Sequence, residues 1–71
     1  MANKKDNQRV KITKKIIKNT LVDMLEDMDI NKITVSSLCK RAEINRSTFY
    51  NYYDDIYDLL KKIEDEIFNE I

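Results

Sequence analysis

Apolar residues recur along the chain at steps of three and four residues, the spacing that places them on one face of an α-helix. The first such run comprises Ile16, Ile17, Leu21, Met24, Leu25 and Met28. It predicts a helix over residues 10–28. The polar segment before it, residues 1–9, is expected to be a flexible basic arm. The apolar pattern breaks between residues 29 and 32.

A second helix is predicted by a capping residue and a pair of apolar neighbours. Thr34 is a favourable N-cap, because its hydroxyl can accept a bond from a free N–H group of the first turn. Ile33 precedes it and Leu38 follows four residues later, the spacing of a hydrophobic staple. The pattern predicts a helix over residues 35–42.

The same arrangement occurs once more after a turn of three residues. Asn45 is a favourable N-cap, and Ile44 and Phe49 flank it at staple spacing. This predicts a third helix over residues 46–52.

A fourth helix is predicted at the end of the chain. Asp54 and Asp55 are suited to cap its first turn and to interact with its dipole. Apolar residues then follow at helical spacing at Ile56, Leu59, Leu60, Ile63, Ile67 and Ile71. The predicted helix covers residues 54–71, and because its apolar face is still in register at the last residue, we expect it to lead into a further C-terminal domain.

The second and third predicted helices together fit a helix-turn-helix unit, which requires inward apolar positions and a small residue where its helices cross. Cys39 is the small residue at the crossing and is expected to be an inert core residue. The inward positions are Leu38, Ala42, Ile44, Phe49 and Tyr52. The turn departs from the general pattern, because Glu43 stands where a left-handed glycine is usual. Keeping that conformation would cost about 1 kcal/mol.

Composition supports an all-α fold and excludes common kinds of catalytic site. The 71 residues include no Gly and no Pro, whereas tight hairpins favour Gly. Without Gly there is no phosphate-binding glycine loop. With no His and one Cys there is no standard zinc site and no Cys–His pair. We therefore expect no enzyme activity, no catalytic residue, no metal and no cofactor.

The formal net charge is zero, but the charges are segregated along the chain. Residues 1–20 carry seven Lys or Arg against one Asp, and residues 32–50 carry four against one Glu. Residues 21–31 carry four acids and no base, and residues 51–71 carry seven acids against two Lys. The basic blocks coincide with the start of the first helix and with the helix-turn-helix, which favours a nucleic-acid partner.

The helix-turn-helix region also resembles the N-terminal signature of the TetR family of bacterial transcriptional regulators. The resemblance covers residues 10–63, and its most specific part is Thr48-Phe49-Tyr50, two residues after Arg46 and ahead of Tyr52-Tyr53. It implies a homeodomain-like three-helix bundle over residues 10–53, followed by the start of a fourth connecting helix. It further implies a sequence-specific DNA-binding domain, expected to serve a repressor, that inserts the third helix into the major groove of an operator.

The resemblance and the geometry of a recognition helix together indicate the DNA-binding residues. The first turn of the third helix would present Arg46, Ser47 and Thr48 to the bases, and Asn45 begins that turn. Matching positions imply backbone contacts for Tyr50, Asn51 and Tyr52, and for Thr34 and Ser36 at the start of the second helix. The predicted DNA-binding residues are thus Thr34, Ser36, Asn45, Arg46, Ser47, Thr48, Tyr50, Asn51 and Tyr52.

Each role has an alternative in the sequence. Arg46 suits a base or a phosphate equally, and Thr34 suits capping alone. The tyrosines suit core packing, with Tyr50 expected outward, Tyr53 in the core and Tyr52 shared between the two. The basic residues at positions 9, 11, 14, 15 and 18 suit a solvated face or added salt-dependent affinity.

A protein-interaction module with the same fold is the competing hypothesis for function. The family usually has a phosphate-binding Lys two or three residues past the aromatic junction, whereas this chain has Asp54, Asp55 and Ile56. As a DNA-binding domain, the chain would have double-stranded operator DNA as its partner. The full protein would be a homodimer through C-terminal helices, with a small-molecule effector not bound by this segment. We expect it in the cytoplasm at the nucleoid, without a membrane association.

Overall fold

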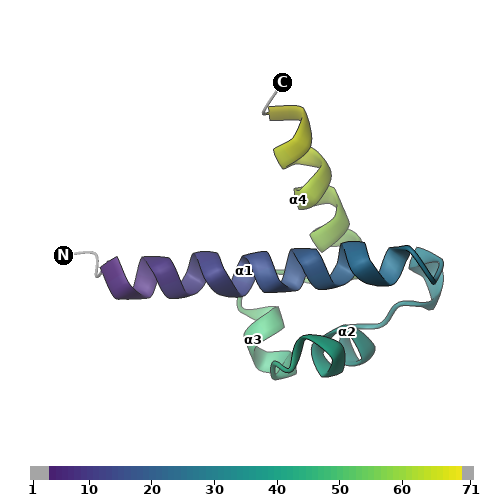
Figure 1. Cartoon of the computed structure of the whole chain (residues 1–71), viewed down its shortest axis with the longest axis horizontal. Helices are drawn as coiled ribbons and strands as arrows, with labels where there is room; N and C mark the ends of the chain where they lie inside the picture. The colour runs from purple at the N-terminus through teal and green to yellow at the C-terminus, as the bar shows by residue number, and fades with distance from the viewer. Residues whose placement is uncertain (1–3, 70–71) are drawn as a thin grey trace.

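The computed structural model describes residues 4–69, and all regular secondary structure in this range is helical. The elements are α1 (Lys4–Leu25), a 3₁₀ turn (Ile30–Lys32), α2 (Val35–Ala42), α3 (Arg46–Tyr50) and α4 (Ile56–Asn69). In Figure 1, α2 and α3 lie on one side of the long helix α1, and α4 rises from its other side. The structure is therefore a small all-α helix-turn-helix bundle with a fourth helix.

A single apolar core joins the four helices. Its buried residues are Ile17, Leu21, Met24, Ile33, Leu38, Cys39, Phe49, Tyr53, Ile56 and Leu59. Every helix contributes at least one of them: α1, α2 and α4 do so from apolar positions at steps of three or four residues, and α3 does so through Phe49. Burying one large side chain of this kind contributes about 1.5–3 kcal/mol relative to leaving it exposed. The core thus fixes where α2 and α3 lie against α1.

The first helix starts earlier and ends earlier than expected. It begins at Lys4, so residues 4–9 are helical and the expected flexible arm over 1–9 is wrong for that part; residues 1–3 lie outside the described range. Lys, Gln and Arg have high helix propensity and neither Gly nor Pro interrupts the segment, which explains the early start. The helix ends at Leu25, and a turn then directs Met28 toward the core.

The second helix begins with the predicted N-cap. Thr34 Oγ1 accepts a hydrogen bond from the Ser37 amide at 3.0 Å, and Ser37 Oγ accepts one from the Thr34 amide at 3.1 Å. These two bonds form a capping box. The staple residues Ile33 and Leu38 both lie in the core. Local capping and burial together therefore set the start of α2 at Val35.

The third helix is shorter than expected, ending at Tyr50 and not at residue 52. The Tyr52 and Tyr53 amides both donate to the Phe49 carbonyl at 3.0 Å, so the chain closes in a turn. That turn brings Tyr53 into the core with 4% of its surface exposed. Burial of Tyr53 explains why α3 does not continue beyond Tyr50.

The fourth helix is capped by one of the two predicted aspartates. Asp55 Oδ1 accepts a hydrogen bond from the Asp58 amide at 2.7 Å. The first turns of α4 are held by buried Ile56 and Leu59, whereas Ile67 and Phe68 are 57% and 73% exposed. Residues 70–71 of the predicted helix lie outside the described range. Within the described residues, no helix is long and apolar enough to span a membrane.

Candidate nucleic-acid interface

The turn between α2 and α3 keeps a left-handed residue without glycine. Glu43 has φ 59° and ψ 44°. Its amide donates to the Lys40 carbonyl at 3.3 Å, and the Ile44 amide donates to the Cys39 carbonyl at 3.0 Å. This is the hydrogen-bond pattern of a Schellman motif, which satisfies the last carbonyls of α2. These bonds hold Glu43 in the left-handed conformation that glycine usually takes at this position.

The third helix has one buried side and one exposed side. Phe49 is completely buried, while Tyr50 beside it is 54% exposed. Their rings meet edge to face with 5.5 Å between centroids, a favourable arrangement of aromatic quadrupoles. Arg46 and Ser47 are exposed on the first turn. The buried ring therefore anchors the helix and leaves its polar residues facing solvent.

The first turns of α2 and α3 are joined by a hydrogen bond between side chains. Arg46 Nη1 donates to Ser36 Oγ at 3.2 Å. Asn45 occupies the N-cap position of α3, but its side chain makes no capping bond. The side-chain amide of Asn45 therefore does not cap α3, whereas the Thr34 hydroxyl is engaged in the capping box of α2.

The nine predicted DNA-binding residues all lie between the N-cap of α2, Thr34, and the junction that follows α3. Most are exposed, and Thr48 and Tyr52 are partly buried. Among them, the structure joins Arg46 to Ser36 directly. The expectations for the tyrosines are confirmed for burial: Tyr50 is outward, Tyr53 is in the core and Tyr52 is intermediate. Contact of these residues with DNA stays a prediction.

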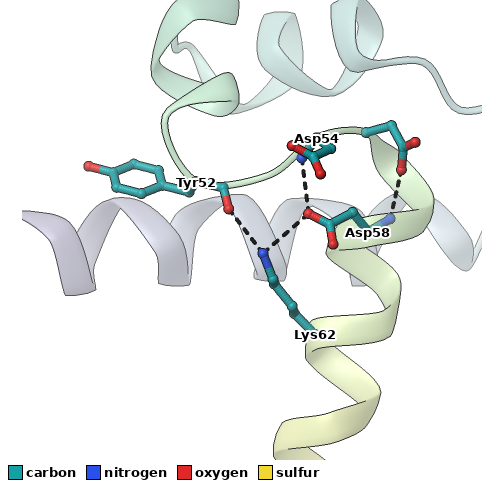
Figure 2. Close-up of polar contacts among 5 residues, drawn as sticks. Tyr52, Asp54, Asp58 and Lys62 are labelled. Atoms are coloured by element: carbon teal, nitrogen blue, oxygen red, sulfur yellow. Dashed lines mark hydrogen bonds and ion pairs between the residues drawn. The ribbon is translucent and has the colours of Figure 1, made fainter.

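A polar network at the junction was not predicted (Figure 2). Lys62 Nζ lies 3.2 Å from Asp58 Oδ2 and donates to the Tyr52 carbonyl at 3.3 Å. Asp58 Oδ2 also accepts a hydrogen bond from the Asp54 amide at 2.9 Å. That backbone bond, with help from Lys62, lowers the pKa of Asp58. The spacing of Asp58 and Lys62, four residues apart on a helix, is the one signal in the sequence that indicates such a pair.

The structure also shows that basic residues of α1 have different partners, which the sequence did not predict. Lys18 Nζ lies 2.5 Å from Glu66 Oε1, linking α1 to α4. Lys14 Nζ lies 5.5 Å from the centre of the Tyr52 ring, a cation–π contact. These partners are 48 and 38 positions away along the chain, so no local pattern reports them.

Cys39 lies in the core behind the interface, as expected. It is 3% exposed. Burial raises the pKa of its thiol, and the positive charge of Arg46 opposes this in part. A raised thiol pKa disfavours the reactive thiolate, which agrees with a packing role. Among the described residues, no group of three or more Cys, Asp and Glu side chains is placed to hold a metal ion.

Two curated bacterial proteins are similar to this chain. The HTH-type dhaKLM operon transcriptional activator DhaS of Lactococcus lactis is 37% identical over 60 residues, covering 84% of this chain and 32% of the relative. The protein YxbF of Bacillus subtilis, named as an uncharacterized HTH-type transcriptional regulator, is 28% identical over 51 residues, covering 72% of this chain and 13% of the relative.

The chain therefore spans about a third of the length of one relative and about an eighth of the other. No family model matches the chain, and no solved structure matches it significantly. Both relatives are named as transcriptional regulators and neither as an enzyme. The similarity to them and the α2–turn–α3 geometry agree, and together they support a DNA-binding domain of a helix-turn-helix transcriptional regulator.

Proposed function

We propose that this chain is the sequence-specific DNA-binding domain of a TetR-like regulator and that α3 enters the major groove of an operator. The observation that carries the proposal is the division of α3 between a completely buried Phe49 and an exposed set that begins with Arg46. In a helix-turn-helix, the part that reaches base edges is the exposed N-terminal turn of the second helix of the motif, which is α3 in this chain. Both relatives are named as HTH-type transcriptional regulators, which supports the coarser function of a DNA-binding regulatory domain.

Each residue of the interface has a distinct role in this proposal. Arg46 reads a guanine through two hydrogen bonds, which is worth about 1–3 kcal/mol of discrimination. Ser47 and Thr48 lie beside it on the first turn and read neighbouring bases. Tyr50 donates its exposed hydroxyl to a phosphate, which positions the domain without reading sequence. The remaining contacts with the backbone come from Thr34, Ser36, Asn45, Asn51 and Tyr52.

The resemblance to the TetR family also implies the organisation of the rest of the regulator. Residues 10–53 form the DNA-binding domain, and residues 54–71 lead to helices that dimerise and bind a small-molecule effector. A homodimer would place two copies of α3 on a palindromic operator. The TetR resemblance favours a repressor, whereas the relative from Lactococcus lactis is named as an activator. The direction of regulation is therefore open to a reporter-gene measurement.

The experiment is a fluorescence anisotropy titration of a labelled mixed-sequence duplex at low and moderate salt. Binding should weaken steeply with salt, because each phosphate contact releases counterions. Arg46→Ala and Tyr50→Phe should both weaken it. Arg41→Ala is the matched control, since Arg41 is an exposed arginine of α2 that pairs with Asp23 on α1; its removal should leave affinity unchanged.

Selection of binding sequences from a random duplex pool then tests specificity. The chain should enrich a common site, and Arg46→Ala should lose the preference at one position of that site. A helical chain that binds no duplex at low salt would contradict the proposal. That result would favour the protein-interaction module, for which the exposed Asp54 and Asp55 after the junction would serve a partner.

A further inference from the structure

The first helix carries a row of lysines that the structure divides into different environments. Lys11, Lys14, Lys15 and Lys18 follow steps of three and four residues and so share one side of α1. No acidic residue lies between residues 7 and 22 to neutralise them locally. Only contacts with other parts of the chain can therefore distinguish these four charges.

Lys18 is neutralised by the fourth helix. Its ammonium lies 2.5 and 2.8 Å from the two carboxylate oxygens of Glu66. The Lys18 side chain is 23% exposed and that of Glu66 is 57% exposed, so the lysine end of the ion pair is partly shielded from solvent. A lysine engaged in this way releases few counterions when DNA binds, because its charge is already compensated.

Lys14, one turn earlier, has an aromatic ring where Lys18 has a carboxylate. Its ammonium lies 5.5 Å from the centre of the Tyr52 ring. Among the described side chains, no carboxylate lies within ion-pair distance of it. A cation–π contact holds the ammonium in place and leaves its positive charge uncompensated. N–H donors of Lys14 that do not face the ring are free to bind an anion.

The ring under Lys14 belongs to the proposed interface. Tyr52 follows α3 by two residues, and Figure 2 shows its side chain directed away from the network of Lys62 and Asp58. The acidic start of α4 is thus on the other side of the Tyr52 backbone. Lys14 thereby brings a positive charge from α1 to the C-terminal end of α3.

We propose that Lys14 is a phosphate-binding residue of the DNA interface and that the ring of Tyr52 positions it. This inference rests on the proposed function and adds a contact from α1 to it. Lys14 would supply a cation near the junction where Asp54, Asp55 and Ile56 stand in place of a lysine. Residues of α1 and α3 would then contact the phosphate backbone of the DNA side by side, near this junction.

The test compares Lys14→Gln with Lys18→Gln in the same duplex titration at several salt concentrations. Losing one phosphate contact makes the negative slope of log affinity against log salt less steep by about 0.9. The affinity ratio of wild type to Lys14→Gln should therefore shrink about 3.5-fold between 50 and 200 mM salt. Lys18→Gln should keep the wild-type slope. Circular dichroism checks that both variants are helical.

The role of the ring is tested by combining Lys14→Gln with changes at position 52. Tyr52→Phe keeps the ring and should leave the effect of Lys14→Gln intact, whereas Tyr52→Leu should remove most of that effect. Equal slopes for wild type and Lys14→Gln, with salt-dependent binding by the wild type, would overturn the inference and leave the proposed function standing. Absence of salt-dependent binding by the wild type would overturn both.

Discussion

Arg46 and Ser36 are joined by a hydrogen bond of 3.2 Å between Nη1 and Oγ, which links the first turn of α3 to the first turn of α2. Both residues are exposed, so the bond contributes little to the stability of the fold. The bond instead sets the direction of the Arg46 side chain, because it restricts the many rotamers that a long side chain would otherwise sample. An arginine whose direction is set in advance loses less entropy when it binds.

Ser36→Ala removes both this bond and the proposed backbone contact of Ser36, so it should weaken binding to a selected operator by about 0.5–1.5 kcal/mol, roughly 2- to 12-fold, with little change in thermal stability. Ser36→Thr keeps a hydroxyl and should bind close to wild type. Anisotropy titrations of the three proteins measure the effect. Tighter binding by Ser36→Ala would contradict this view, because it would mean that the bond holds Arg46 away from DNA.

Glu43→Gly should stabilise the domain. The left-handed conformation of Glu43 is unfavourable for a residue with a Cβ, and glycine removes that penalty while adding some entropy to the unfolded chain. The net gain is about 0.5–1 kcal/mol, and 1 kcal/mol corresponds to about 4–8 °C in Tm for a domain of this size. Glu43→Ala, which keeps a Cβ, is the control and should melt near wild type. Equal melting of all three proteins would argue against strain at this turn.

Phe49→Ala and Tyr50→Ala should differ sharply although the residues are neighbours. Phe49 is completely buried, and its truncation leaves a cavity that costs about 3–5 kcal/mol. A chain of this length has a total stability of roughly 4–10 kcal/mol, so the variant should lose between about a third and all of it. Tyr50 is 54% exposed, and losing its contact with Phe49 costs about 0.5–1.5 kcal/mol. Urea unfolding followed by circular dichroism measures both.

Asp58 should make stability depend on pH in the acid range. The hydrogen bond from the Asp54 amide, with help from Lys62, holds the pKa of Asp58 below its unfolded value. Its contribution is therefore fully present above the unfolded pKa of about 3.9 and is lost as pH falls through the lower folded pKa. The Tm of wild type should exceed that of Asp58→Asn at pH 7, and the difference should shrink at acid pH.

Asp65→Asn is the matched control on the same helix, because Asp65 is exposed and lies away from the junction. Its Tm should follow wild type across the same pH series. A difference between wild type and Asp58→Asn that stays constant from neutral to acid pH would contradict the role assigned to the Asp58 carboxylate.

Sequence reasoning was most successful where one short segment contains its own signals. Thr34 as N-cap and Ile33 with Leu38 as staple mark the start of α2 within a few residues of one another, and the helix occupies the predicted residues. It was less accurate at the ends of α1 and α3. There the boundary depends on whether Met28 and Tyr53 turn into a core made by other helices, which no local pattern encodes.

The sequence by itself determined the four amphipathic helices, the turn around Glu43 and the outward place of Arg46 and Tyr50, because helix periodicity and capping act over a few residues. Only the tertiary structure decided which lysine meets which partner. Lys14 contacts the Tyr52 ring and Lys18 forms an ion pair with Glu66, because α1 packs against segments that are far from it in the chain. Such contacts follow from the packing of helices around a shared core, and the spacing of residues along the chain does not specify them.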